Sequence, residues 1–213
     1  MNEPHSRRST LKQATDHLHR ELDGIASGYE LRDADHYAAF LEASAGPLIA
    51  LERVLESAGV AQLLPDWSER RRADLLLDDL RRLGRQATPP VLRRASPSPS
   101  EMFGVLYVLE GSRLGARWLY ARVCSSPDAK VSEARSYLAA HNPSLWRSFL
   151  EILESSPHAT DAQGMISGAR YAFVLFQRSL VTFAPEIPKG NSVTPAYAGV
   201  HPDPRHGLPR ARE

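Results

Sequence analysis

The sequence predicts an all-α protein with a single globular domain. Apolar residues recur every three or four positions along most of the chain, which is the spacing of helices that bury one face. We find no convincing run of alternating apolar and polar residues bounded by hairpin turns, so no sheet is expected. The chain has 213 residues, 42% of them hydrophobic, and is long enough to build one core without disulfides or structural metal.

Seven helices are expected, and a loop rich in proline and serine separates the third from the fourth. Their spans are about residues 10–27, 35–58, 66–83, 101–124, 130–140, 143–153 and 161–183. Glycines follow several of these segments as stop signals, and the Gly46-Pro47 pair should kink the second helix. We expect residues 1–9 to be an N-terminal extension, residues 10–185 the folded domain, and residues 186–213 a disordered tail rich in proline and glycine.

Composition and charge exclude some classes of function. The formal net charge of +1 argues against a general nucleic-acid or membrane surface, and no apolar run is long enough to cross a bilayer. A single cysteine, Cys124, and the lack of a secretory signal indicate a cytoplasmic protein. Arginines cluster at positions 70–72, 81, 82, 85, 93 and 94. We interpret them as a solvated helix face, with docking of an acidic protein as the alternative.

The first helix carries a possible metal ligand, His19. Helical geometry places His19 at one edge of the apolar stripe, with Lys12, Thr15 and Asp23 on the same side, and turns His17 about 160° away. Asp23 lies one turn after His19, where its carboxylate can bind one imidazole nitrogen while the other nitrogen holds a metal. The alternative is an ordinary histidine at the surface or at the edge of the core.

The fourth helix contains three glycines on one face, although each costs about 1 kcal/mol of helix stability relative to alanine. Gly104, Gly111 and Gly115 lie within about 40° of their neighbours around the axis, and Ser112 and Ala116 widen the resulting groove. Such a groove allows either close packing of two helices or the approach of a flat ligand to the backbone. For Gly104 alone, two turns before the others, a packing role is favoured. Together, the histidine helix and the glycine helix predict a planar metal cofactor between them.

These two segments resemble those of the haem oxygenase family. LKQATDHLHRELD is similar to its proximal helix, and LYVLEGSRLGARWL is similar to its distal helix, particularly in the bacterial group associated with bacteriophytochromes. The resemblance covers residues 10–183 and implies a single-domain haem oxygenase-like helical bundle. It also implies that His19 is the axial ligand of the haem iron and that Asp23 contacts this histidine.

Further roles follow from the same resemblance, position by position. Gly111 and Gly115 match glycines that pass over the haem, and Ser112 stands where animal relatives have an aspartate that organises distal water. Ala116 replaces a second glycine of the usual pair. Lys12 and Arg147 match basic residues that bind haem propionates. Side chains that either line the haem pocket or simply pack in the core are Tyr107, Phe173 and Phe176.

The activity implied by the resemblance is oxidative cleavage of haem to biliverdin, carbon monoxide and iron. Haem is then both substrate and cofactor, and the reaction uses O2 and reducing equivalents from a ferredoxin- or flavoprotein-type donor. A bacteriophytochrome is implied as a receiver of biliverdin. One alternative is a non-catalytic haem carrier or sensor of the same fold. The other is a thiamin-degrading enzyme, which would need Cys124 as its nucleophile.

Overall fold

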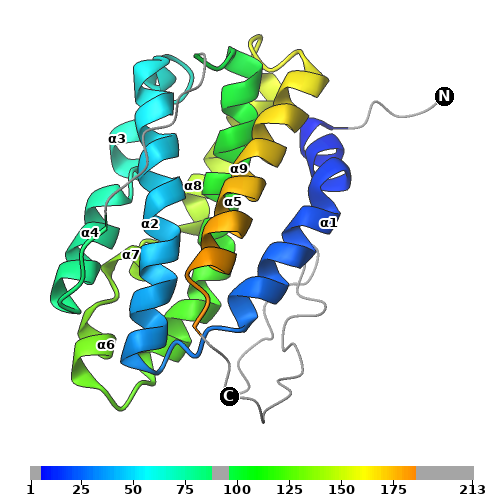
Figure 1. Ribbon diagram of the computed structural model, residues 1–213. Helices are drawn as coiled ribbons and strands as arrows, with labels where there is room; N and C mark the ends of the chain where they lie inside the picture. Colours follow the sequence, from blue (N-terminus) through cyan, green and yellow to red (C-terminus); the bar gives the residue numbers. More distant parts are fainter. Residues whose placement is uncertain (1–5, 88–95, 186–213) are drawn as a thin grey trace, which may run out of the picture.

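The protein is a bundle of α-helices (Figure 1). The computed structural model describes residues 6–87 and 96–185, and every regular element in these two ranges is helical. The five long helices are α1 (Arg7–Ser27), α2 (Ala34–Ser57), α5 (Pro99–Cys124), α8 (Pro143–Ser155) and α9 (Ala162–Thr182). The short ones are η1 (Val60–Gln62), α3 (Trp67–Arg70), α4 (Ala73–Arg82), α6 (Ala129–Glu133) and α7 (Ser136–Ala139). The predicted all-α class is confirmed. Of the helices described, none is both long and apolar enough to cross a membrane.

Helix α9 lies at the centre of the bundle. It packs most extensively on α5, then on α1 and α2, so it joins the histidine helix to the glycine helix. In Figure 1, α9 (orange) runs between α1 (blue) and α2 (light blue), in front of α5 (green). By contrast, α1 and α5 touch each other little within the described residues, although both run from top to bottom in this view. The two predicted walls of the site are therefore held apart by other helices.

Two glycines allow α5 and α9 to cross at very short range. A methyl group built on Gly104 would lie only 1.9 Å from the carbonyl oxygen of Met165, and one on Gly168 only 2.1 Å from that of Glu101. No side chain fits at either position, because backbone fills the space that a Cβ atom would need. The expected packing role of Gly104 is confirmed, and Gly168 of α9 is its unforeseen counterpart.

Two predicted helices are in fact pairs of shorter helices. The segment at residues 66–83 breaks between α3 and α4, because the buried carboxylate of Glu52 accepts hydrogen bonds from the backbone amides of Arg72 (2.8 Å) and Ala73 (3.2 Å). The segment at residues 130–140 breaks between α6 and α7, where Asp79 accepts the amides of Ser136 and Tyr137. Each carboxylate binds amides that start a new helix, which favours a restart over continuation.

Helix boundaries otherwise differ from expectation by a few residues. α1 begins at Arg7, with the Ser6 side chain as its cap, so helix reaches into the segment expected to be an extension. α5 begins at Pro99, because Ser98 and Glu101 form a capping box. α2 continues through Pro47 to Ser57. The tail at residues 186–213, residues 1–5 and the loop residues 88–95, with Arg93 and Arg94, lie outside the described residues.

Candidate functional site

His19 lies on α1 with its side chain about half exposed. Its Nδ1 atom is 3.0 Å from Oδ2 of Asp23, one turn further along the helix, as predicted. The hydrogen bond that His19 donates to Asp23 raises the pKa of His19, and burial opposes this shift. The ring meets Phe173 of α9 edge to face, with centroids 6.0 Å apart. Because Asp23 accepts the Nδ1 proton, Nε2 is the ring nitrogen that is oriented to ligate a metal.

The other residues predicted along α1 divide into two groups. Lys12, two turns before His19, is exposed, and so is His17. Thr15 is buried and donates its hydroxyl hydrogen bond to the carbonyl of Leu11 within the same helix (2.7 Å). Thr15 is therefore a core residue whose polar group is satisfied locally.

The glycines of the distal segment face different surroundings. A methyl group built on Gly115 would meet nothing within 4 Å. One on Gly111 would lie 3.7 Å from the indole ring of Trp146, at ordinary contact distance. Ala116 is only 5% exposed, so its methyl group already packs against protein. Of these positions, Gly115 thus has the most open surroundings, whereas Gly111 is backed by a residue of α8.

Tyr107 shows that this face of α5 points toward α1. Its ring packs on Trp146, with centroids 5.6 Å apart. Burial raises the pKa of Tyr107, and the charges of Arg8 and Asp16, both on α1, act on it in opposite directions. One turn after Asp16 lies His19, and one turn after Tyr107 lies Gly111. Figure 1 shows α1 and α5 running in the same direction. The helical spacing therefore predicts that the His19 edge of α1 is turned toward the glycine face of α5.

Ser112 is held by an arginine that the sequence had placed on a solvated face. The Ser112 hydroxyl donates to the carbonyl of Leu109 (2.7 Å) and accepts from Nη2 of Arg72 (2.9 Å). Arg72 also donates to the Leu109 carbonyl (2.7 Å), lies over the ring of Tyr137, and is only 3% exposed. The solvated interpretation was wrong for Arg72, which anchors the backbone directly before Gly111.

Arg70 is also buried, in an ionic cluster beneath the same segment. Its guanidinium binds Glu110 (Nη1 to Oε2, 2.7 Å) and, through two bonds of 2.7 Å, both oxygens of Asp66. Glu110 is shared with Arg113, which also donates to the carbonyls of Arg70 and Ala140. Interactions with Arg70 lower the pKa of Asp66. Glu110 and Arg113 flank Gly111, so the cluster fixes the backbone of the glycine segment from its buried side.

Three exposed arginines of this region pair with carboxylates, whereas Arg82 is exposed and has no ion pair among the described contacts. Arg71 binds Glu56 at 2.7 Å, Arg85 binds Asp35 at 2.8 Å, and Arg81 binds Asp78 one turn away. Arg147, predicted to bind a haem propionate, is exposed on α8 beside Trp146. Its role and that of Lys12 stay predictions. Phe173 contacts His19, as described above, and Phe176 packs against the core.

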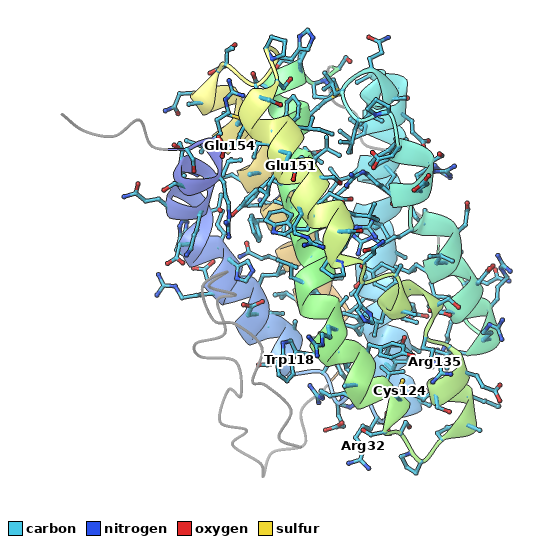
Figure 2. The ribbon with its side chains drawn as sticks, turned by 180° about the vertical axis from the view of Figure 1, so that it is seen from behind. Arg32, Trp118, Cys124, Arg135, Glu151 and Glu154 are labelled. Atoms are coloured by element: carbon cyan, nitrogen blue, oxygen red, sulfur yellow. The ribbon has the colours of Figure 1, made fainter. Side chains whose placement is uncertain are left out.

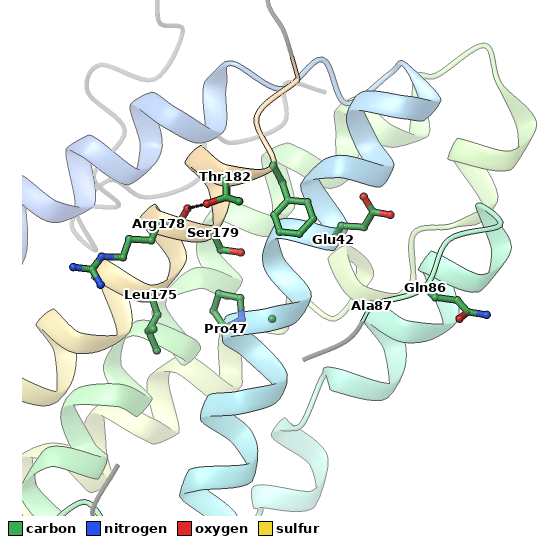
Figure 3. Close-up of a pocket in the computed structure, with 10 residues that line it drawn as sticks. Glu42, Pro47, Gln86, Ala87, Leu175, Arg178, Ser179 and Thr182 are labelled. Carbon is green, nitrogen blue, oxygen red and sulfur yellow. Dashed lines mark hydrogen bonds between the residues drawn. The ribbon is translucent and has the colours of Figure 1, made fainter. Parts of the chain in front are cut away.

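A cavity of about 480 Å³ lies elsewhere in the fold (Figure 3). It lies between α2 and the C-terminal half of α9, and its lining includes Pro47, Leu175 and Arg178. None of the predicted site residues lines it. On the other side of α9, Gln177 donates to the carbonyl of Leu18 in α1 (3.0 Å). The cavity and the His19 edge are therefore on different sides of α9.

Comparison with known proteins identifies the family. Over 155 residues the chain is 35% identical to a haem oxygenase of Xanthomonas campestris, and the match covers 71% of this chain and 93% of the relative. The chain belongs to the haem oxygenase family. The haem oxygenase PigA of Pseudomonas aeruginosa is 28% identical over 153 residues, which are 70% of this chain and 77% of PigA. No family model matches the chain.

Solved haem oxygenases share the fold. The NO- and CO-bound haem oxygenase of Neisseria meningitidis superposes with a TM-score of 0.65 at 22% identity, covering 85% of this chain and 97% of that one. The haem oxygenase of Leptospira interrogans also superposes with a TM-score of 0.65, at 20% identity, and the match covers 83% of this chain and 99% of that one. The family assignment favours haem chemistry over the thiamin-degrading alternative. Cys124, the nucleophile that alternative needs, ends α5, and its sulfur accepts a hydrogen bond from Arg135 (3.3 Å; Figure 2).

The residues of this haem oxygenase chain fit a haem group. His19 would offer Nε2 to the iron, because its Nδ1 is paired with Asp23, and its ring is in edge-to-face contact with Phe173. Gly115 supplies backbone with open space where a side chain would begin. Trp118 is on the same face of α5, one heptad after Gly111, and is 53% exposed. A ligand with two flat apolar faces would cover the exposed ring of Trp118 and the backbone of Gly115, which are otherwise exposed to solvent.

Proposed function

We propose that this haem oxygenase chain cleaves haem to biliverdin, carbon monoxide and iron, using O2 and reducing equivalents from a donor protein. Haem is substrate and cofactor at once. The proposal requires one juxtaposition, in which His19 faces the backbone of Gly115 across the gap between α1 and α5. It is supported by the pairing of His19 with Asp23, by the open space at Gly115 and by the few contacts between α1 and α5 within the described residues. Membership of the family supports the same activity.

His19 holds the iron through Nε2 in this proposal. Asp23 accepts the Nδ1 proton, which fixes the ring orientation and makes the imidazole a better donor to the metal. When bound, the haem supplies the redox chemistry and also the carbon atom that is oxidised. Phe173 supports the imidazole edge to face, so the ligand cannot rotate without losing an aromatic contact.

The distal side is shaped by backbone. With haem bound, Gly115 would leave room for a diatomic molecule beside the backbone of α5, and the lack of a side chain at Gly111 would allow the backbone to approach the ring. The Ser112 hydroxyl donates a hydrogen bond to the Leu109 carbonyl, and Arg72 donates one to the hydroxyl oxygen of Ser112. Ser112 and Arg72 therefore act together: the guanidinium fixes the hydroxyl and places a positive charge near the distal side. Lys12 and Arg147 are proposed to bind the propionates and set the rotation of the ring.

We further propose a ferredoxin- or flavoprotein-type donor, and a bacteriophytochrome as the receiver of biliverdin in a cytoplasmic setting. The arginines of α3 and α4 give the docking proposal limited support. Arg71, Arg81 and Arg85 already pair with carboxylates of this chain, so among the described arginines here Arg82 is left to attract an acidic partner. Added salt should weaken turnover with a protein donor but not with a small chemical reductant.

The deciding experiment combines haem, a reductant and O2, and measures the bilin product by absorption and mass spectrometry. Wild-type protein and the His17→Ala variant should both bind haem and form biliverdin. His19→Ala should lose the haem-bound spectrum and turnover, because the axial ligand is gone. A wild-type protein that binds haem without forming bilin is a carrier or sensor. If His17→Ala loses haem and His19→Ala keeps it, the proposed ligand is wrong.

A further inference from the structure

Helix α8 is attached at its N-terminal half to the distal side of the site. Arg70 donates to the carbonyl of Leu145 and to the hydroxyl of Ser148, both at 2.8 Å. Trp146 lies between them and packs against the face of α5 that carries Gly111 and Tyr107. Because Arg70 is also bound to Glu110 of α5, this half of α8 is fixed relative to the distal helix.

The C-terminal end of α8 is attached to the proximal helix α1. Glu154 accepts the backbone amides of Arg7 and Arg8, at 3.0 and 2.9 Å. In return, Nη1 of Arg7 donates to the carbonyls of Leu153, Glu154 and Ser156, at 2.6, 2.8 and 3.0 Å. Figure 2 shows Glu154 beside the first turn of α1.

The two helix ends complete each other. The first amides of α1 and the last carbonyls of α8 have no partners inside their own helices, and each end supplies the other with the missing groups. The charges have the favourable signs, since a carboxylate lies at the N-terminus of one helix and a guanidinium at the C-terminus of the other. We call this arrangement of Arg7 and Glu154 the reciprocal cap.

We infer that the reciprocal cap is a positioning device for haem: Arg7 and Glu154 fix α1 to α8 and so set how far His19 stands from the distal helix. α1 barely touches α5, so the separation of the two walls is set by the helices that bridge them. α9 is one bridge, and its contact with α5 is rigid because of Gly104 and Gly168. α8 is the other, and the reciprocal cap is its joint to α1. This inference assumes the proposed function, in which His19 ligates haem.

The matched pair of variants is Glu154→Ala and Glu151→Ala. Both residues are exposed glutamates on α8, but Glu151 lies one turn earlier, away from the first turn of α1 (Figure 2). In Glu154→Ala we expect haem to transfer to excess apomyoglobin about tenfold faster than from the wild type. A tenfold change in rate corresponds to a difference of ~1.4 kcal/mol in the barrier to release. The iron–histidine stretching band in the resonance Raman spectrum of the ferrous complex should also shift. Glu151→Ala should match the wild type in both measurements.

Arg7→Met is the second test, because it keeps the backbone amide and an unbranched apolar stem but removes the donors to three carbonyls. It should also speed haem release. In the double variant Arg7→Met/Glu154→Ala, the increase in the release rate should be smaller than the two single effects combined, since the two residues form one joint. Wild-type release and an unshifted band in either single variant that folds would overturn the inference, and so would an equal effect of Glu151→Ala. If the wild type shows no iron–histidine band, the proposed function itself fails.

Discussion

Alanine substitutions at Gly104 and Gly115 should change stability in opposite directions, although both glycines lie inside the same helix. At Gly104 the added methyl group would stand 1.9 Å from the Met165 carbonyl oxygen, about 1.5 Å short of ordinary contact, so α5 and α9 must separate. At Gly115 the methyl group meets no atom within 4 Å. Gly104 serves helix packing, and Gly115 is proposed to leave space for haem.

The magnitudes follow from these two environments. Alanine gains about 1 kcal/mol over glycine in a helix interior. At Gly115 nothing opposes this gain, so the haem-free variant should be more stable by up to ~1 kcal/mol. At Gly104 the overpacking penalty is about 3 kcal/mol or more, because the obstacle is backbone rather than a flexible side chain. The net loss should be about 2 kcal/mol or more.

Urea unfolding of the haem-free proteins, followed by circular dichroism, measures both changes. Haem turnover of the Gly115→Ala variant then separates stability from function, because the methyl group should crowd the distal side and slow bilin formation. A Gly104→Ala variant as stable as the wild type would refute the close crossing of α5 and α9. A Gly115→Ala variant that loses stability while haem-free would show that its surroundings are not open.

The polar contacts around the glycine segment give three further predictions. Arg72→Met should cost about 2 kcal/mol in urea unfolding, because it removes the donor to the buried carbonyl of Leu109 and to the part-buried hydroxyl of Ser112; wild-type stability would contradict the assigned contacts. Ser112→Ala should retain haem but slow bilin formation, and unchanged kinetics would remove Ser112 from the distal side. Asp66 has a lowered pKa, so its stabilising effect is present above its ordinary value of 3.8 and is lost as the pH falls below it. In Asp66→Asn the free energy of unfolding should therefore fall less steeply as the pH is lowered through the acid range. The difference should be less than ~1 kcal/mol, because the carboxylate is partly exposed. The same acid dependence in variant and wild type would argue against the ion pair.

Features that depend on local geometry were predictable from the sequence. The pairing of His19 with Asp23 follows from a four-residue spacing on one helix, and the structure places them in contact. The packing role of Gly104 follows from its separation from the other glycines, although its counterpart Gly168 does not, since that residue lies in a helix 64 positions later. Sequence periodicity locates a bare helix face but does not name what crosses it.

The buried arginines could not be predicted from local pattern. Arg70 and Arg72 lie in a run of charged residues that is typical of a solvent-exposed helix. Their partners Glu110 and Ser112 are 40 positions later and become neighbours only through the fold. The same holds for the break between α3 and α4, which is imposed by Glu52, 20 positions earlier than Arg72. Long-range polar contacts of this kind leave no periodic signal.

The most direct measurement is a crystal structure of the ferric haem complex. Our account predicts that the iron is bonded to Nε2 of His19 and that the opposite face of the ring lies under the backbone of Gly115. Iron bonded to His17 or to another side chain would contradict it. Haem in the cavity lined by Leu175 and Arg178 would contradict it as well.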